Sequence, residues 1–366
     1  MAYVDPAVSV QNRQANPAYT SCAGKCFIRS TQYPEAMDGC LVNKKGGKNV
    51  VYYDWFQNGT QTQWKGLIAN YFKDVGFDGL WTTENEPFGQ VPGEVKVGAN
   101  GEVEEDSVKL LGEQPFEASV DPDVDQSWFY SFWPLNRTST FFLPFIPQYQ
   151  RAGNYDNLTL SLNATHDSGE TEYNLHNLYA HAMMKATFAA VNEVQNDTRP
   201  FLLTRGSYSS TGRYASQNLQ TQVATYDTLY YSQQSALRSQ IFGMSHSGAD
   251  ISCNQTGGVF DQELCLRFFQ LAAWLPLARH VYTGPQSAPY NFNGEYYNQL
   301  FDTMHSRMQY LRLIYTCLQE VNDGGGSCLQ PMDLLFDVPA GNALTEETFM
   351  VARALKISPV MHPLKG

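Results

Sequence analysis

"FDGLWTTENEP", residues 77–87, is the stretch that indicates the fold of this chain. Its first five residues, Phe77 to Trp81, read as a buried strand, and this run ends abruptly in polar residues and a proline. In a protein of alternating strands and helices, such a strand end is where an active-site carboxylate would stand. Two threonines stand there instead, followed by Glu84, Asn85 and Glu86. The stretch has the layout of an active-site strand whose central chemistry has changed.

Strand-like and helix-like segments alternate along the rest of the chain. The predicted strands lie near 2–10, 49–56, 77–81, 200–205, 244–250, 277–281 and 350–360, and the predicted helices cover about 62–75, 174–195, 226–241, 261–275 and 298–319. This alternation predicts parallel βαβ units, in a (β/α) barrel or a doubly wound sheet. Polar residues follow most of the strands, as at the functional end of a barrel. No glycine-rich phosphate loop follows a strand, which argues against a nucleotide-binding sheet.

Composition excludes several classes of protein. The 366 residues suffice for one barrel-sized domain or two ordinary ones, and a hydrophobic fraction of 43% argues against disorder. A formal net charge of −12 argues against a nucleic-acid partner, because phosphate binding needs clustered Lys and Arg. No apolar run reaches the roughly 20 residues of a membrane-spanning helix. We therefore expect no nucleic-acid partner and no membrane span.

Glycosylation sequons and cysteines point to a secreted or lumenal protein. Seven cysteines accompany six N-x-S/T sequons, at Asn58, Asn136, Asn157, Asn163, Asn196 and Asn254. The first ten residues lack the pattern of a signal peptide, so we expect this chain to be a segment of a longer secreted precursor.

The cysteine spacing predicts local crosslinks. Cys253 with Cys265, and Cys317 with Cys328, are close enough in sequence for two loop-closing disulfides. A third group, Cys22, Cys26 and Cys40, is odd in number, so one of them is left over or pairs outside the chain. No spacing typical of a zinc site is present, and we expect no metal and no cofactor.

Five segments, taken together, resemble the catalytic domain of glycoside hydrolase family 31, the α-glucosidase family. "FDGLWTTENEP" resembles the family's nucleophile strand, whose pattern reads roughly W-x-D-M-N-E. The other segments, in family order, are residues 172–187, 199–227, 242–252 and 261–280. The matches run from about residue 3 to residue 361.

The resemblance implies a (β/α)8 TIM-type barrel that is incomplete. "YVDPAVS" at 3–9 resembles the family's third strand, so residues 1–366 would form a single barrel segment that begins near strand three. Residues 87–170, which show no clear period, would form a long inserted loop after strand four. A barrel without two strands leaves open edges. We expect the missing strands on another chain or an upstream segment.

The catalytic carboxylates of the family are replaced in this chain. Retaining glycosidases use two carboxylates about 5 Å apart, one as nucleophile and one as acid/base. The resemblance places Thr83 at the nucleophile position and Thr221 at the acid/base position. A neutral hydroxyl is a poor nucleophile without a base beside it, and it cannot donate a proton at useful pH.

Other positions of the sugar subsite are mixed. Trp81, Arg205 and Asp250 match family residues that line this subsite. The sugar-contacting histidine falls on Val281, and Asn254 stands where an aromatic residue closes the pocket. Each retained residue also has a structural interpretation. Trp81 suits a core position, Arg205 suits an ion pair with Asp250, the two glutamates suit solvated or capping positions, and we interpret His166, His176 and His181 as structural.

Two functions follow from these observations. The first is a catalytically inactive, α-glucosidase-like protein that binds glycans or has a structural role in a secreted glycoprotein assembly. The alternative is an active glycoside hydrolase or transglycosidase on α-linked glucosides, with Glu84 or Glu86 as nucleophile and Asp250 as acid/base. A carboxylate pair near 5 Å inside the pocket would favour the enzyme. A split enzyme completed by a partner would still carry threonine at positions 83 and 221.

Overall fold

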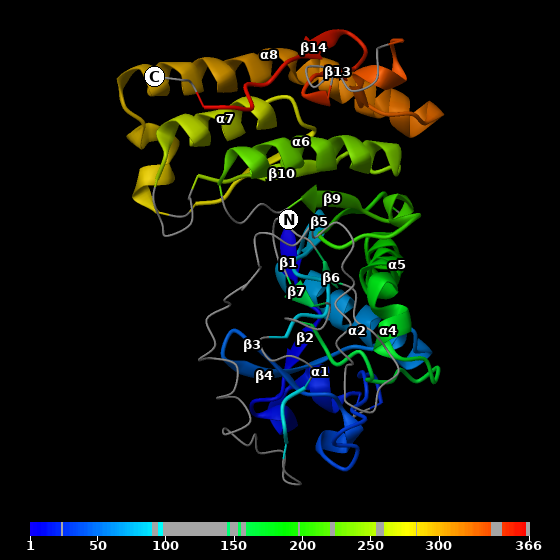
Figure 1. Cartoon of the computed structure of the whole chain (residues 1–366). Helices are drawn as coiled ribbons and strands as arrows, with labels where there is room; N and C mark the ends of the chain where they lie inside the picture. Colours follow the sequence, from blue (N-terminus) through cyan, green and yellow to red (C-terminus); the bar gives the residue numbers. More distant parts are fainter. Residues whose placement is uncertain are drawn as a thin grey trace. The chain divides into compact units, whose positions relative to one another are not determined.

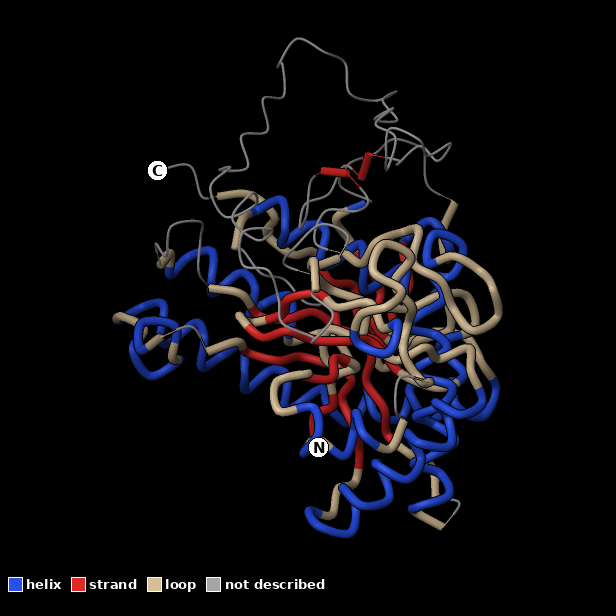
Figure 2. Tube along the Cα trace, turned by 90° about the horizontal axis from the view of Figure 1, so that it is seen from below, coloured by secondary structure: helices blue, strands red, loops and turns tan. Residues whose placement is uncertain are grey.

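The computed structural model describes residues 1–22, 25–89, 94–97, 145–146, 153–154, 159–196, 198–219, 224–253, 260–282, 284–337 and 346–363. These residues form two compact units, Met1–Tyr208 and Ser209–Gly366, which are taken one at a time below. Figure 1 labels their helices and strands, and Figure 2 colours the strands red and the helices blue.

A three-stranded parallel sheet forms the centre of the first unit. Its strands are β1 (Ala2–Val4), β5 (Gly79–Thr82) and β8 (Phe201–Thr204), and β5 lies in the middle. Helices α2 (Asn58–Val75) and α5 (Tyr179–Val194) precede β5 and β8 respectively and pack against each other. A Cβ at Gly79 would overlap the carbonyl oxygen of Phe201, so the close approach of β5 and β8 requires glycine here.

The predicted strand at 2–10 is two strands in two sheets. The chain leaves β1 at Asp5-Pro6 and continues as β2 (Ala7–Ser9), which pairs antiparallel with β4 (Lys48–Tyr52). The hairpin partner of β4 is β3 (Asn43–Lys45), in a region that the sequence indicated as loop. Gly46 and Gly47 connect the two strands with φ of 56° and 73°, the left-handed conformations that a two-residue hairpin turn needs.

Aromatic side chains fill the core of the first unit. The indole of Trp55 packs edge-on against Trp64 of α2 (5.2 Å between centroids) and against Tyr179 of α5 (6.2 Å). The indole N–H of Trp64 donates to the hydroxyl of Thr187 at 3.0 Å, which joins the two helices. The shorter elements of this unit are η1 (Arg13–Ala15), α1 (Pro17–Thr20), η2 (Met37–Gly39), β6 (Phe145–Ile146), β7 (Gly153–Asn154), α4 (Glu172–Leu175) and η5 (His176–Leu178).

The second unit repeats the parallel arrangement. Strands β9 (Ser216–Leu219), β10 (Gly248–Ile251) and β11 (Leu277–His280) lie side by side, with β10 in the middle. Helix α6 (Tyr226–Ile241) precedes β10, and α7 (Gln262–Ala272) precedes β11. Polar side chains start both helices, because Thr225 accepts from the N–H of Thr228 and Asp261 accepts from that of Leu264. The sequence analysis did not identify β9.

A long helix and a small antiparallel sheet complete the second unit. Helix α8 (Gly294–Gly324) packs against α7. The predicted final strand at 350–360 is a hairpin of β13 (Phe349–Val351) and β14 (Leu355–Ile357), and β12 (Leu329–Pro331) pairs with β13. The single-turn elements of this unit are η6 (Thr211–Arg213), η8 (Pro285–Ser287), η9 (Pro289–Asn291) and η10 (Met332–Leu334). None of the helices in the described part of the chain is long and apolar enough to cross a membrane.

Candidate functional site

An aromatic pair lies at the centre of the first unit's parallel sheet. Trp81 on β5 is in register with Tyr3 on β1, so both side chains leave the same face of the sheet. Their ring centroids are 5.3 Å apart. Trp81 is 4% exposed, whereas Tyr3 is 57% exposed. The pair therefore presents an accessible phenol ring beside a largely covered indole.

Thr83 directly follows β5, at the position that the family resemblance assigns to the nucleophile. Its backbone N–H donates to the carbonyl of Val4 at 3.1 Å, which extends the pairing of β5 with β1 by one residue. The side chain is partly buried and ends in a hydroxyl. A hydroxyl at this strand end can accept and donate hydrogen bonds to a ligand, but it carries no charge with which to attack a carbon.

Asn85 holds the polar segment after β5 against the segment after β8. Its amide nitrogen donates to the hydroxyl of Thr204 at 2.8 Å, and its amide oxygen accepts from the backbone N–H of Gly206 at 2.9 Å. The side chain is completely buried. The sequence analysis gave Asn85 no role, although its place in the W-x-D-M-N-E pattern was a signal that could have identified it. The framework of the strand end is thus intact around Thr83.

Glu84 is ion-paired with a lysine from the β3–β4 hairpin. The ammonium of Lys45 lies 3.0 Å from the carboxylate of Glu84 and 2.6 Å from that of Asp5, which follows β1. The backbone of Glu84 has a φ of 47°, a left-handed conformation that turns the chain sharply after β5. Sequence reasoning missed both Lys45 and Asp5; for Asp5, its position at a strand end was an available signal. One ammonium group thus contacts two carboxylates from two different strand ends.

Glu86 and Arg205 form a second ion pair, also at the carboxyl ends of the parallel strands. The guanidinium Nε of Arg205 is 3.8 Å from a carboxylate oxygen of Glu86. The arginine, just after β8, is largely buried, whereas the glutamate is accessible. Within the first unit, the ion-pair partner of Arg205 is Glu86.

Asp250 lies in the second unit, on β10, and is held by Arg279 of β11. The guanidinium donates to both carboxylate oxygens, with Nε at 2.8 Å from Oδ1, and the amide of Asn218 on β9 donates to Oδ1 at 3.1 Å. Asp250 is 2% exposed. These donors hold both oxygens of the Asp250 carboxylate in place, and two of the hydrogen bonds come from a charged guanidinium.

His280 follows Arg279 on β11, and its side chain leaves the opposite face of the sheet. Its ring centroid lies 5.3 Å from that of Phe269 on α7, and burial lowers the pKa of the imidazole. The following residue, Val281, is apolar at the position where the family resemblance expects a sugar-contacting histidine. The alternation along β11 places His280 and Arg279 on opposite faces of the sheet.

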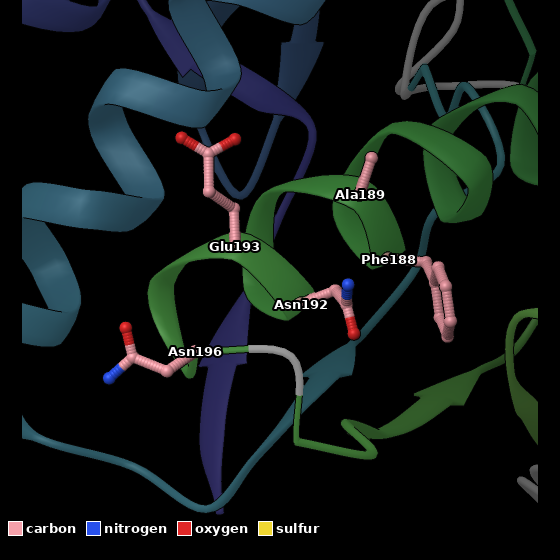
Figure 3. Close-up of a pocket in the computed structure, with 5 residues that line it drawn as sticks. All are labelled: Phe188, Ala189, Asn192, Glu193 and Asn196. Atoms are coloured by element: carbon pink, nitrogen blue, oxygen red, sulfur yellow. The ribbon is translucent and has the colours of Figure 1, made fainter.

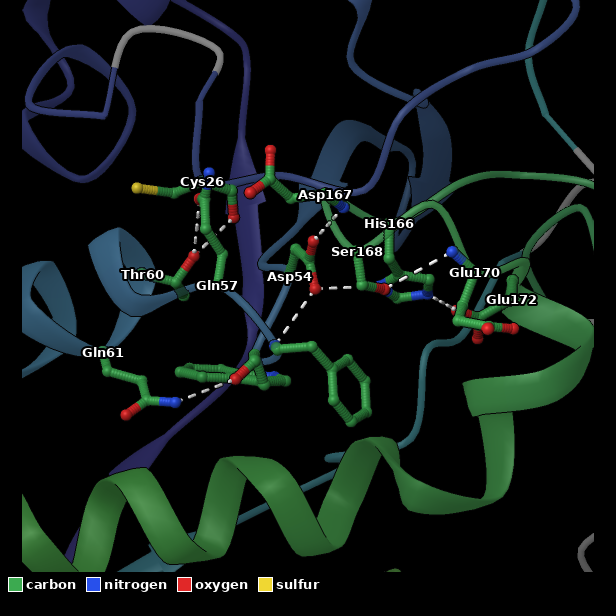
Figure 4. A network of polar contacts seen from close by, with 12 residues as sticks. Cys26, Asp54, Gln57, Thr60, Gln61, His166, Asp167, Ser168, Glu170 and Glu172 are labelled. Atoms are coloured by element: carbon green, nitrogen blue, oxygen red, sulfur yellow. Dashed lines mark hydrogen bonds and ion pairs between the residues drawn. The ribbon is translucent and has the colours of Figure 1, made fainter.

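A buried chain of charged residues lies elsewhere in the first unit (Figure 4). His166 is 2.8 Å from Asp54 through Nδ1 and 2.8 Å from Glu172 through Nε2, and His176 contacts the second oxygen of Glu172 at 3.0 Å. Burial opposes a charge on His166, but the hydrogen bonds with Asp54 and Glu172 outweigh it and raise its pKa to about 9. Burial likewise opposes charge on Glu172, yet its two histidine partners lower its pKa. The imidazole therefore acts as a cationic bridge between two carboxylates.

An open depression on α5 is lined by Phe188, Ala189, Asn192, Glu193 and Asn196 (Figure 3). All five residues belong to the helix or to its C-terminal end, whereas the candidate residues follow the strands. Glu193 is ion-paired with Lys65 of α2. This depression contributes nothing to the candidate site. Within the described ranges, no group of three or more His, Cys, Asp or Glu side chains is arranged to hold a metal ion.

The predicted crosslink and glycan positions are distributed over both units. Disulfides join Cys253 to Cys265, Cys317 to Cys328, and Cys22 to Cys26, and Cys40 is buried. Burial raises the pKa of the Cys40 thiol to about 11. Of the sequon asparagines, Asn58 and Asn196 are exposed and Asn163 is half-buried. Four predicted positions lie outside the described residues: Thr221, Asn136, Asn157 and Asn254.

Curated proteins are similar to this chain in sequence. The chain is similar to the alpha-glucosidase of Mucor javanicus, with 26% identity over 379 residues that cover 98% of this chain and 40% of that protein. It is also similar to the lysosomal alpha-glucosidase of Mus musculus, with 25% identity over 369 residues that cover 100% of this chain and 34% of that protein. The chain therefore spans less than half the length of these relatives.

Solved structures share the fold at lower sequence identity. The Flavobacterium johnsoniae GH31 dextranase complexed with glucose superposes with a TM-score of 0.67 and 18% identity, over 98% of this chain and 37% of that one. The glucosidase II alpha subunit in its Glc1Man2-bound form has a TM-score of 0.66 and 18% identity, over 99% of this chain and 32% of that one.

The family comparison agrees with these similarities. The model of the "Glycosyl hydrolases family 31 TIM-barrel domain" matches residues 1–317. This match includes Trp81, the segment that follows it and the strand that carries Asp250. The chain belongs to glycosyl hydrolase family 31, within the TIM-barrel domain of that family.

Proposed function

We propose that this chain is a degenerate, α-glucosidase-like member of family 31 that does not hydrolyse glycosides. It would bind glycans, or serve as a structural component, in a secreted or lumenal glycoprotein assembly. The observation that carries the proposal is the environment of Thr83. The buried amide of Asn85 holds the strand end in place, while the position that needs a carboxylate carries a hydroxyl.

The nearby carboxylates support inactivity. A glycosidase nucleophile must reach the anomeric carbon, and its partner must stand about 5 Å away on the other side of the bond. Glu84 is turned toward Lys45 by its left-handed backbone, and Glu86 is paired with Arg205. Asp250 is buried under Arg279. Each carboxylate of the alternative function already has a cation as partner.

Retained aromatic and charged groups support binding of a sugar. Tyr3 offers an exposed ring on which the apolar C–H groups of a sugar can pack, and the buried ring of Trp81 packs against it. Arg205, Glu86 and Asp5 lie at the same strand ends and can pair with sugar hydroxyls. A relative with the same fold is described as binding Glc1Man2. An α-linked glucoside is therefore the first ligand class to test.

The proposal that this chain is part of an assembly rests on an open edge of the parallel sheet. In the first unit, β1 ends the parallel sheet and its outer edge has no neighbouring strand among the described residues. An open edge of this kind pairs readily with another strand. Residues 1–366 would form one barrel segment that begins near strand three, with 87–170 as an insertion, and another chain or segment would supply the missing strands. A glucosidase II structure is described as a heterodimeric complex.

The secretory location rests on the three disulfides and the sequons. Disulfides persist in oxidising compartments, and glycans are attached to Asn-x-Ser/Thr in the secretory pathway. One relative is described as lysosomal and a structural relative as an ER enzyme.

A working glycosidase with relocated carboxylates is the second candidate. It is favoured by the partial exposure of Glu84 and Glu86, whose carboxylates remain accessible at the strand ends. In that case Lys45 would have to release Glu84 when substrate binds.

One pair of assays separates the two functions. The chain, produced in a eukaryotic secretory host, is tested for glucose release from maltose and for binding to α-glucosides by titration calorimetry. The proposal expects no release above background, and binding that Tyr3→Ala abolishes while Tyr290→Ala, a change at an exposed ring in the other unit, preserves it. Hydrolysis that Glu84→Gln or Glu86→Gln removes would establish the enzyme instead.

A further inference from the structure

Helix α8 carries an exposed stripe of large apolar side chains. The stripe consists of Tyr297, Phe301, Met304, Met308, Leu311 and Tyr315, each between 41% and 72% exposed. The spacing alternates between four and three residues, which is the a/d repeat of a helix that packs along its length against another helix. We call these six residues the α8 stripe. Single exposed apolar residues are ordinary, but a continuous row of six marks an interaction surface.

The opposite side of α8 is already committed to its own unit. Leu300 and Ile314 belong to a buried hydrophobic cluster that also contains residues of α6 and α7, and Cys317 is joined to Cys328. The guanidinium of Arg307 donates to the backbone carbonyls of Ala272, Ala273 and Leu275 at 3.0, 2.9 and 2.8 Å, at the end of α7. These contacts fix the rotation of the helix about its axis. The helix therefore cannot rotate to bury the stripe unless part of the unit unfolds.

We propose that the α8 stripe binds the α8 stripe of a second copy of this chain, with the two helices antiparallel. The order of the side chains is the argument. From either end toward residue 306 the stripe reads tyrosine, a large apolar residue, methionine. A two-fold axis at that point places Tyr297 against Tyr315, Phe301 against Leu311 and Met304 against Met308 of the second copy. Every a position then meets a d position, as antiparallel helix pairs require, and the surface is self-complementary.

The flanking residues suit this arrangement. On one side of the stripe lie Asn298, His305 and Arg312, which are spaced seven residues apart. The same two-fold brings Asn298 opposite Arg312 of the second copy, so an amide oxygen can accept from a guanidinium, and His305 comes near its own equivalent. Within one copy, the imidazole of His305 stacks on Phe301, with centroids 6.2 Å apart and planes 9° apart. None of these three flanking residues is acidic, so this side of the proposed helix pair brings no two carboxylates together.

The size of the stripe suits a weak to moderate dimer. From Tyr297 to Tyr315 the helix rises about 27 Å. With side chains of this size about half exposed, the contact would bury on the order of 600 Å² per copy, close to the roughly 800 Å² per partner of a standard interface. A lipid surface is a poorer occupant, because helices that lie on membranes carry many basic residues and α8 contains no lysine.

The first test measures mass in solution. Sedimentation velocity of the secreted chain between about 1 and 100 μM should show a monomer–dimer equilibrium. The double variant Met304→Glu with Met308→Glu places carboxylates across the axis and should weaken the dimer at least 100-fold. The matched control, Ile241→Glu, changes an exposed apolar residue at the end of α6 and should leave the equilibrium unchanged. Circular dichroism melts of both variants establish that they fold.

The second test measures orientation. Under mild oxidation a mixture of Met304→Cys and Met308→Cys chains should crosslink into heterodimers, and each variant alone should crosslink far less. A chain that is monomeric at 100 μM, a dimer indifferent to the double glutamate variant, or crosslinking of Met304→Cys to itself would each overturn the proposal. Binding of the stripe to anionic vesicles in preference to self-association would also overturn it. None of these readouts depends on whether the chain binds or hydrolyses a glycan.

Discussion

Single residues decide the chemistry at the end of β5. Asn85 keeps both hydrogen bonds that hold the polar segment in place, while Thr83 carries the hydroxyl. The ammonium of Lys45 contacts the carboxylates of both Glu84 and Asp5, so one cation is shared by two anions at these strand ends. A site can lose its catalytic groups and still bind a ligand. In our proposal, this site keeps groups that bind a sugar and lacks the catalytic carboxylates.

Restoring the carboxylates should recover little activity. Thr83→Asp combined with Thr221→Asp returns the nucleophile and the acid/base, each of which ordinarily contributes at least about 10²–10⁴ in rate. We expect glucose release from maltose to remain near background, because the family resemblance puts Val281 and Asn254 where a sugar-contacting histidine and a pocket-closing aromatic residue would stand. Recovery to a rate comparable with the α-glucosidases would show that only the two carboxylates were missing. The Thr83→Asn, Thr221→Asn chain is the control for changes in packing.

The Asp250–Arg279 pair should be structural. Arg279→Met leaves a buried carboxylate without its cation and should lower the free energy of unfolding by about 3 kcal/mol, measured in urea. Asp250→Asn combined with Arg279→Met removes both charges and should restore about half of that loss or more. If Arg279→Met instead weakened glycan binding while stability stayed constant, the arginine would be a ligand-binding group.

At the level of elements, buried charges connect segments that no regular pairing joins. Asp54 follows β4, His166 lies before α4, and Glu172 begins α4. The carboxylate of Asp54 also accepts from the backbone N–H groups of Phe56 and Asp167, at 3.1 and 2.8 Å. The imidazole of His166 thus stabilises a loop through two ion pairs instead of through a sheet or helix.

This network should make stability depend on pH in two directions. The folded pKa of His166, about 9, is above its ordinary 6.5, so its contribution is complete below about 6.5 and is lost as the pH rises through 9. The pKa values of Asp54 and Glu172 are lowered, so their contributions are lost as the pH falls below their ordinary values of 3.8 and 4.5. The melting temperature should therefore be highest between about 4.5 and 6.5.

A histidine variant assigns that profile to the network. His166→Gln should remove most of the fall between pH 6.5 and 9, which is worth up to about 3 kcal/mol. His362→Gln changes an exposed histidine and should leave the profile as it is. A decline above pH 6.5 that persists in His166→Gln would place its origin elsewhere in the chain.

At the scale of the whole molecule, the chain consists of two units, each with a parallel sheet and its own core. The TIM-barrel model of family 31 matches residues in both units, while the chain spans only 40% of the Mucor relative. Among the described residues, the outer edge of β1 has no neighbouring strand, and the α8 stripe is a second exposed surface. The assembly that we propose would cover them.

Native material should carry the marks of the secretory pathway. Peptide mapping without reductant should recover the three crosslinked pairs, Cys22–Cys26, Cys253–Cys265 and Cys317–Cys328. Intact mass before and after deglycosylation should show glycans on at least two sequons, with the exposed Asn58 and Asn196 occupied before the half-buried Asn163. Free thiols at these positions together with an unmodified mass would place the protein in a reducing compartment.

The sequence by itself determined the order of the main elements and the family, and it supplied the hypothesis that Thr83 stands at the nucleophile position. Helix and strand periods arise from backbone geometry over a few residues, so α6 appears at its predicted bounds. Each of the five segments that resemble family 31 is likewise contiguous, and their order along the chain indicated the family without any three-dimensional information.

Only the tertiary structure decided the pairings. The partners of Arg205, Asp250 and Lys45 come from other strands, and which ion pair forms depends on where those strands lie after folding. The split of residues 2–10 between two sheets, the disulfide between Cys22 and Cys26, and the exposure of the α8 stripe depend on folding in the same way. Contacts between residues distant in sequence depend on how the elements pack, and a local sequence pattern does not predict that packing.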